Sequence, residues 1–79
     1  MPPRDEWSEF CRSFGDAARR RREELGLTQE TLGFRSGLDR TYVSGIERGV
    51  RNPTLKIVGR LAKALGTPAS RLLATAERR

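Results

Sequence analysis

Arginine is the residue type in this sequence best equipped for chemistry. The chain has 16 lysines and arginines, and only Lys56 and Lys63 among them are lysine. A guanidinium donates two parallel hydrogen bonds to a phosphate or a base edge, which an ammonium cannot do. With 10 aspartates and glutamates, the formal net charge is +6. This composition fits a polyanionic partner, and by itself it also fits a basic surface that is merely solvated.

Catalytic chemistry has almost no suitable residues. Histidine is absent and Cys11 is the single cysteine, so the usual general base, a cysteine-based zinc site and an internal disulfide are all excluded. No nucleophile–base pair and no glycine-rich phosphate loop is visible. We therefore expect no enzymatic activity, no metal and no cofactor.

The length sets further limits. A chain of 79 residues allows one domain, which we place at 1–79, with an N-terminal extension at 1–13. No apolar stretch approaches the roughly 18 residues of a membrane span, and the N-terminus lacks the apolar core of a signal peptide. The lone thiol fits a reducing environment. We expect a cytoplasmic protein.

Five short helices must position these residues. Apolar residues recur at helical spacing and no segment alternates as a strand does, which predicts an all-α fold. The first helix begins near Asp5 and ends before Gly26. Its expected apolar face comprises Trp7, Phe10, Cys11, Phe14, Ala18 and Leu25. The fourth helix follows Thr54 with an expected face of Leu55, Val58, Leu61, Ala62 and Leu65, and the fifth begins at Thr67-Pro68.

The two middle helices form a helix-turn-helix pattern over about 28–47. Thr28 and Asp39 are suitable N-caps for helices that end near Gly37 and Gly49. Gly33 offers a small residue at the crossing, and Gly37 permits the positive φ of a tight turn. On the helix from 40 to 47, Val43 and Ile46 face the core. The opposite face consists of small or polar residues, namely Arg40, Thr41, Ser44 and Gly45.

Three motifs resemble the Cro/CI-type (XRE) helix-turn-helix family: LGLTQE at 25–30, SGLDRTY at 36–42 and IERG at 46–49. Within it, the segments at 38–48 and 51–55 resemble the controller proteins of restriction–modification systems. The resemblance covers about residues 14–73 and implies a compact, lambda-repressor-like five-helix domain. It also implies a homodimer that binds double-stranded operator DNA and regulates transcription. A bacterial, nucleoid-associated location and the sigma subunit of RNA polymerase as a further candidate partner follow from the same resemblance.

The resemblance assigns roles to individual residues. Arg40, Thr41 and Ser44 match the base-reading face, and Gln29 matches a phosphate-binding position at a helix N-terminus. Arg51 fits a base contact and a phosphate contact about equally. Tyr42 fits packing on DNA, with an aromatic at the core edge as the alternative. The remaining expected phosphate contacts are Thr28, Asn52, Thr54 and Lys56.

Other residues are expected to support the structure. The family pairs the position of Glu47 with an arginine that corresponds to Arg22, which neutralises a carboxylate near DNA. Arg21 departs from the family's usual apolar residue, and we expect its stem to cover the core while its charge reaches water. Ile57, Leu72 and Leu73 exceed what a small core needs, so we expect the fourth and fifth helices at the dimer interface. The first helix is the alternative dimer surface because it carries Trp7.

Two readings compete with a controller protein. An antitoxin or a phage or plasmid repressor would share the fold and the DNA binding. A protein-interaction module that has lost DNA binding belongs to another class, and Arg40 argues against it because such a module would favour an acidic third helix. The neighbouring genes would distinguish a controller protein from an antitoxin or a phage or plasmid repressor.

Overall fold

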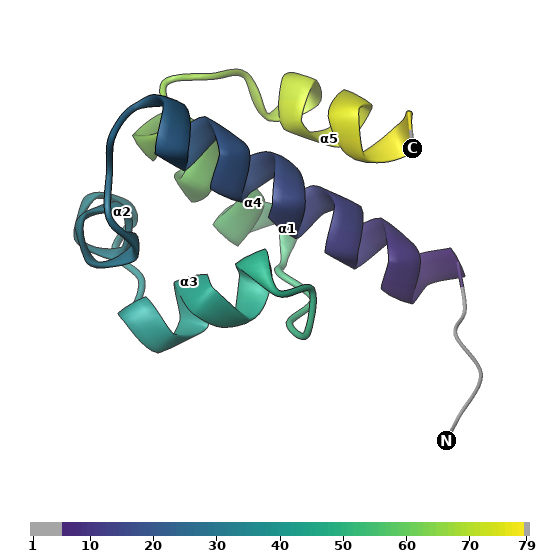
Figure 1. Ribbon diagram of the computed structural model, residues 1–79, viewed down its shortest axis with the longest axis horizontal. Coiled ribbons are helices and arrows are strands. Elements are labelled where there is room, and N and C mark those ends of the chain that lie inside the picture. Colours follow the sequence, from purple (N-terminus) through teal and green to yellow (C-terminus); the bar gives the residue numbers. More distant parts are fainter. Residues whose placement is uncertain (1–5, 79) are drawn as a thin grey trace.

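The computed structural model describes residues 6–78, and these residues form five α-helices (Figure 1). Their bounds are α1 (Glu6–Glu24), α2 (Gln29–Ser36), α3 (Arg40–Glu47), α4 (Leu55–Ala64) and α5 (Ala69–Glu77). The all-α, five-helix prediction is confirmed. The expected cap at Asp5 lies outside the described residues. No helix between residues 6 and 78 is long and apolar enough to span a membrane.

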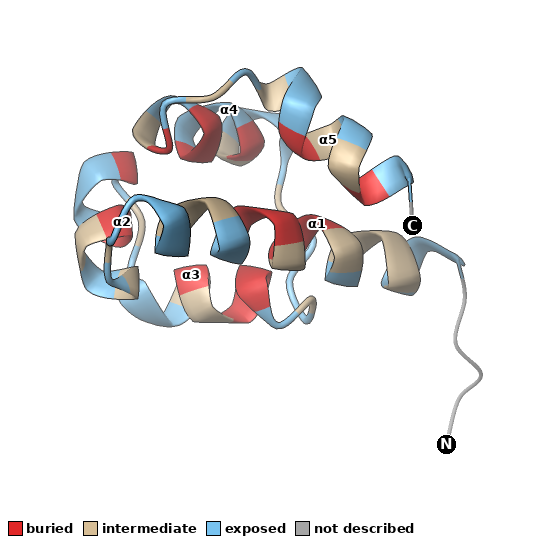
Figure 2. Cartoon of the chain, turned by 45° about the horizontal axis from the view of Figure 1, so that its top comes forward, coloured by how far each residue is buried: buried red, intermediate tan, exposed pale blue. Residues whose placement is uncertain are grey.

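The long helix α1 lies at the centre of the fold. It packs against α5 on one side and α3 on the other, while α2 contacts both α3 and α4 (Figure 1). The buried residues of all five helices face this centre (Figure 2). The largest fully buried side chains are Leu32, Val43, Ile46, Leu61 and Leu65. One shared core therefore fixes α3 relative to the other helices.

Local capping determines where the middle helices begin. The side chains of Thr28, Asp39 and Thr54 accept hydrogen bonds from backbone N–H groups in the first turns of α2, α3 and α4. Gly37 ends α2 with a φ of 73°, the left-handed conformation that favours glycine. The prediction for α5 was one residue too early, because its N-cap is Pro68 rather than Thr67 and no side chain caps it.

Three residues expected on apolar faces are exposed. Trp7, Leu25 and Leu55 all contact solvent, with Leu55 82% exposed. Helices α3 and α5 cover only the middle of α1, where Phe14, Ala17 and Ala18 are buried, so its first turn projects beyond them. Leu25 follows the end of α1. Leu55 is the first residue of α4. Helical side chains point toward the N-terminus of their helix, so this side chain extends beyond the helix end and away from the core.

Gly15 allows the close crossing of α1 and α3. A Cβ atom added there would overlap the carbonyl oxygen of Ile46 and lie 2.8 Å from that of Glu47. Both obstacles are backbone atoms, which cannot rotate away as a side chain can. A larger residue at this position must therefore separate the two helices.

We expect Gly15→Ala to lower the free energy of unfolding by about 1–3 kcal/mol, as overpacked cores do. The matched control is Gly59→Ala in α4, where an added Cβ meets nothing within 4 Å. That replacement should stabilise by up to about 1 kcal/mol, since alanine is the better helix former. Urea unfolding followed by circular dichroism measures both. A Gly15→Ala variant as stable as the parent would contradict this account of the crossing.

Candidate nucleic-acid interface

The N-terminal half of α3 presents the residues expected to read bases. Val43 and Ile46 are buried and anchor the helix to the core. Arg40 and Thr41 are exposed on its other side, and Ser44 is half-buried. The carboxylate of Asp39 accepts a hydrogen bond from the backbone N–H of Thr41 at 2.9 Å, which fixes the start of the helix. An exposed guanidinium therefore stands at a rigid helix end.

Arg51 lies across the second half of the same face. A Cβ atom added at Gly45 would lie 2.7 Å from Cγ of Arg51, so the arginine stem covers this glycine. Gly45 lies on the expected side of α3, away from the core, but it is buried because the Arg51 stem covers it. The Arg51 guanidinium lies 5.5 Å from the centre of the Tyr42 ring, a cation–π distance. Tyr42 thus orients a cation beside α3.

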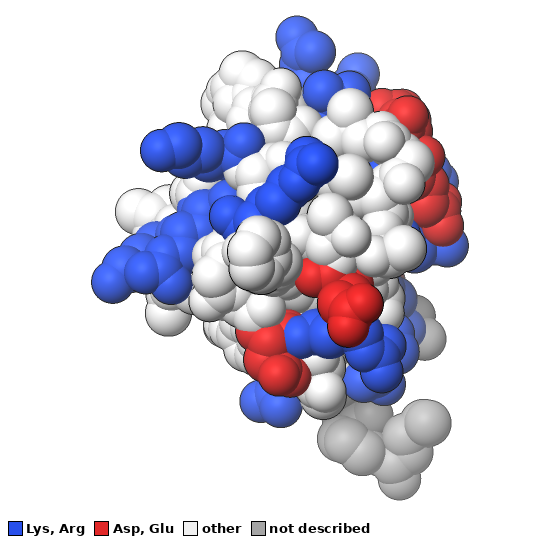
Figure 3. All heavy atoms as spheres, turned by 90° about the vertical axis from the view of Figure 1, so that its left-hand side faces the viewer, with Lys and Arg blue, Asp and Glu red and all other residues white. Residues whose placement is uncertain are grey.

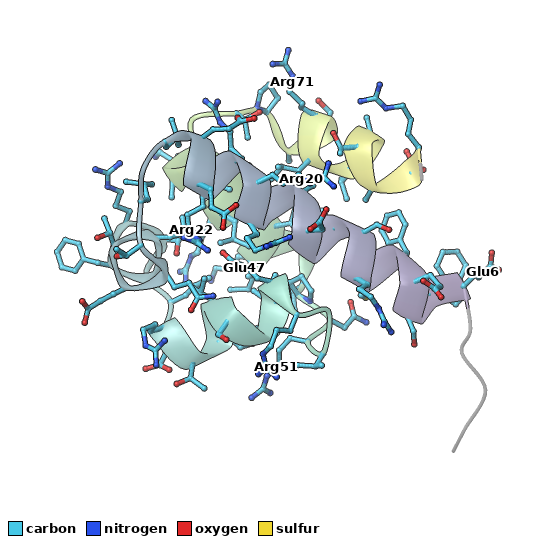
Figure 4. The ribbon with its side chains drawn as sticks, in the orientation of Figure 1. Glu6, Arg20, Arg22, Glu47, Arg51 and Arg71 are labelled. Atoms are coloured by element: carbon cyan, nitrogen blue, oxygen red, sulfur yellow. The ribbon has the colours of Figure 1, made fainter. Side chains whose placement is uncertain are left out.

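A buried ion pair ties α1 to the end of α3. The guanidinium of Arg22 donates from Nε to Oε2 of Glu47 at 2.7 Å and from Nη2 to Oε1 at 3.0 Å (Figure 4). The two side chains are only 12% and 3% exposed. Hydrogen bonding to Glu47 raises the pKa of Arg22 above its ordinary value, so the guanidinium stays charged. The family resemblance implied this pair, and the structure contains it.

Gln29 extends the pair toward Arg40. Its Nε2 donates to Oε1 of Glu47 at 3.0 Å, and its Oε1 accepts from Nη1 of Arg40 at 3.5 Å. Sequence reasoning treated Gln29 as facing phosphate or water alone and missed both bonds. Four side chains from α1, α2 and α3 therefore form one hydrogen-bonded series that ends at the exposed Arg40.

The other expected phosphate contacts differ in availability. Asn52 and Lys56 are exposed around the start of α4. The hydroxyl of Thr54 accepts from the N–H of Ile57. The hydroxyl of Thr28 accepts from the N–H of Thr31 and also donates to its hydroxyl, each at 3.0 Å. The donor of Thr28 is thus engaged within the chain, so its expected phosphate contact would require that bond to break.

Arg21 keeps a side chain that is 35% exposed, and its guanidinium also bonds within the chain. Its Nε donates to the carbonyl oxygen of Leu65 at 3.0 Å, and its Nη1 lies 3.4 Å from Oε1 of Glu24. Leu65 follows the last residue of α4, where backbone carbonyls lack helical partners. An arginine at this position therefore caps α4, which an apolar residue could not do.

The expected interface residues do not share one environment. Leu72 is 4% exposed and belongs to the core of its own chain, so its assignment to a dimer surface was wrong. Ile57 and Leu73 are half-buried at the core edge. Leu73 lines an apolar groove of about 170 Å³ together with Phe10, Cys11, Phe14, Asn52, Pro53, Leu55 and Val58. Apolar surface therefore remains open beside the start of α4.

Metal binding has no structural support in the described part of the chain. Among residues 6–78, no three histidine, cysteine, aspartate or glutamate side chains lie together as a metal site requires. What the arrangement offers is exposed arginine on a rigid helix, which suits phosphate and base edges.

Comparison with known proteins agrees with this geometry. Residues 19–72 match a family model described as helix-turn-helix. An uncharacterised HTH-type transcriptional regulator of Sinorhizobium fredii is 53% identical over 47 residues. That match covers 60% of this chain and only 61% of the relative's length.

Two solved structures of restriction–modification controller proteins are also similar. The controller C.AhdI from Aeromonas hydrophila has a TM-score of 0.77 and 48% sequence identity, covering 78% of this chain and 94% of that protein. The controller C.Esp1396I was solved as a tetramer in complex with its natural 35 base-pair operator. It has a TM-score of 0.78 and 35% identity, covering 87% of this chain and 91% of that one.

Proposed function

Because the chain belongs to the helix-turn-helix family, we propose that it is a sequence-specific DNA-binding transcription regulator, namely the controller of a restriction–modification operon. The observation that carries the proposal is the exposed face of α3, where Arg40 is exposed at the helix start and linked through Gln29 to the Arg22–Glu47 pair. The similarity to two controller proteins supports the biological role. No catalytic step is part of the proposal.

The geometry suggests how the chain would engage DNA. With α3 in the major groove, the Arg40 fork addresses O6 and N7 of a guanine, while Thr41, Ser44 and Arg51 reach neighbouring base edges. Phosphates would meet Gln29, the free N–H groups that open α2, and the exposed Asn52 and Lys56. The carboxylate of Glu47 does not oppose this approach, because Arg22 neutralises it.

The operator tests the proposal directly. We expect nuclease footprinting on the DNA upstream of the gene to protect a pseudo-palindrome whose half-sites lie about one helical turn, roughly 10 base pairs, apart. Affinity should fall steeply with salt as phosphate contacts release counterions. In vitro transcription from that promoter with RNA polymerase and its sigma subunit then distinguishes activation from repression. Binding without preference for any sequence would contradict the proposal.

We also propose a homodimer that uses the apolar groove and the neighbouring surface of α4. Leu55 is exposed there and Leu73 lines the groove. Leu55→Asp and Leu73→Asp should each shift a dimer toward monomer in sedimentation equilibrium at micromolar concentration, and should weaken operator binding. A parent chain that sediments as a monomer would contradict the proposal.

The same experiment needs a control that separates association from folding. Leu72→Ala supplies it, because Leu72 belongs to the core rather than the surface. It should cost about 2–5 kcal/mol of stability through cavity formation. The dissociation constant of the dimer should stay near the parent value wherever Leu72→Ala remains folded.

A further inference from the structure

The outer side of α2 carries an aromatic ring that the proposed DNA contacts do not use. Phe34 is 89% exposed, more than any other large apolar residue in the described part of the chain. Its neighbours Leu32, Gly33 and Ser36 are buried, so α2 is firmly packed and the ring is turned outward. A phenyl ring left in water forgoes about 1.5–3 kcal/mol that burial would give. Residues 6–78 leave the ring almost uncovered.

Positive charge lies on the α4 side of the ring. Phe34 borders an open depression of about 690 Å³ between α2 and α4, which we call the α2–α4 depression. Its other lining residues are Arg35, Ser36, Gly37, Arg60, Lys63 and Ala64. None of its three cations belongs to an ion pair among residues 6–78. Figure 3 views this side, where lysine and arginine side chains surround uncharged surface and acidic ones lie lower and at the right edge.

Helix stability explains part of this arrangement. Arg35 lies in the last turn of α2, and Nη1 of Arg60 lies 3.9 Å from where a Cβ of Gly37 would be. Cations near a helix C-terminus interact favourably with its dipole. That effect accounts for the position of two arginines. It does not account for an exposed phenyl ring among them.

Neither DNA nor a second copy suits this surface well. At 100° per residue, Phe34 lies about 140° around α2 from Gln29, which bonds to α3 on the proposed DNA side. Duplex phosphates would use the cations but gain nothing from a phenyl ring. A second copy is proposed to bind at the apolar groove instead, and at this surface its net charge of +6 would meet three cations. An acidic partner with an apolar anchor matches both the ring and the cations.

We propose that the α2–α4 depression docks an acidic segment of another protein. One apolar side chain of that segment packs on Phe34 while its carboxylates meet Arg35, Arg60 and Lys63. Glu30 lies one turn before Phe34 on the same side of α2, so repulsion directs the segment toward α4. The surface lies apart from α3, so such a partner could bind while DNA is held. The proposal does not depend on which operator the chain reads.

Nuclear magnetic resonance with a designed probe tests this. The probe is a peptide of about twelve residues in which aspartates and glutamates flank one central phenylalanine, titrated to about 1 mM into the isotope-labelled full chain. Amide shifts should appear in the second half of α2 and in α4. Phe34→Ser should weaken binding about tenfold, as loss of an apolar anchor does. Val50→Ser, an exposed apolar residue outside the depression, should change the affinity less than about twofold.

Charge is tested in the same way. The double variant Arg60→Gln, Lys63→Gln should lower the affinity for the acidic peptide. The loss should exceed that of the control double variant Arg71→Gln, Arg78→Gln, which removes the same charge outside the depression. Absence of binding at about 1 mM, shifts centred on α3, or an unchanged affinity of Phe34→Ser would each overturn the proposal. A single-stranded oligonucleotide that binds the depression more tightly would assign it to nucleic acid instead. Self-association through Phe34 would assign it to a second copy.

Discussion

Replacing Glu47 with alanine should lower the free energy of unfolding by about 3–5 kcal/mol, because the guanidinium of Arg22 would then be buried without its carboxylate. The pair joins α1 to α3 through two hydrogen bonds, and its members are 12% and 3% exposed. Arg22 would keep only its bond to the carbonyl oxygen of Leu27 at 2.8 Å. Gln29 would lose an acceptor as well. Thermal and urea unfolding measure the loss.

The matched control is Arg20→Ala, also in an ion pair of α1. Arg20 lies 2.9 Å from Asp16, but its side chain is 69% exposed, and such surface pairs contribute about 0–1 kcal/mol. A second comparison is the double variant Arg22→Met, Glu47→Leu. Replacing both charges leaves none stranded, so the double variant should be more stable than Glu47→Ala. Equal losses for Glu47→Ala and Arg20→Ala would mean that Glu47 behaves as a surface residue.

Helix boundaries were predictable where local chemistry sets them. Thr28, Asp39 and Thr54 each cap a helix through bonds spanning two or three residues, and Gly37 takes the positive φ its turn requires. Such signals are contained in a few consecutive residues. Thr67 failed as a cap because the chain begins α5 one residue later, at a proline that has no side-chain donor or acceptor.

Burial was less predictable, because helical periodicity gives the direction of a face but not the extent of its neighbours. Leu55 continues the apolar pattern of α4, yet no other helix covers it. Leu72 seemed surplus to a small core, yet α1 and α5 pack closely enough to bury it. The sequence did not indicate that Gly15 permits the close crossing of α1 and α3, since this role depends on backbone atoms about thirty residues away.

The sequence predicted individual residues of the site but not the contacts that connect them. Arg40, Thr41 and Arg51 were identifiable from the motif and the family resemblance, which also implied the partner of Glu47. The bond from Gln29 to Glu47 and the position of Arg51 over Gly45 and the Tyr42 ring join parts that only the fold brings together. A sequence names suitable donors and acceptors, whereas their pairing depends on side-chain placement.

Arg40→Ala should cost about 1–3 kcal/mol for each half-site, hence about 2–6 kcal/mol for a bound dimer. It should also relax the preference at one base pair per half-site, because the guanidinium is the group placed to read a guanine. Binding measured at fixed salt on single-base operator variants gives both quantities. Circular dichroism should show no loss of structure, since Arg40 is exposed.

Gln29→Ala is the comparison for Arg40→Ala, because it should weaken DNA binding without changing the sequence preference. The Gln29–Arg40 bond, at 3.5 Å, is at the limit of a hydrogen bond, whereas the Gln29–Glu47 bond is 3.0 Å. Gln29 is thus held mainly by Glu47 and is placed to contact the DNA phosphate backbone. Its loss should therefore weaken binding to every operator variant nearly alike. If Arg40→Ala also weakened all variants equally, α3 would not be the element that reads sequence. If Gln29→Ala instead changed the preferred base, Gln29 would act through the orientation of Arg40.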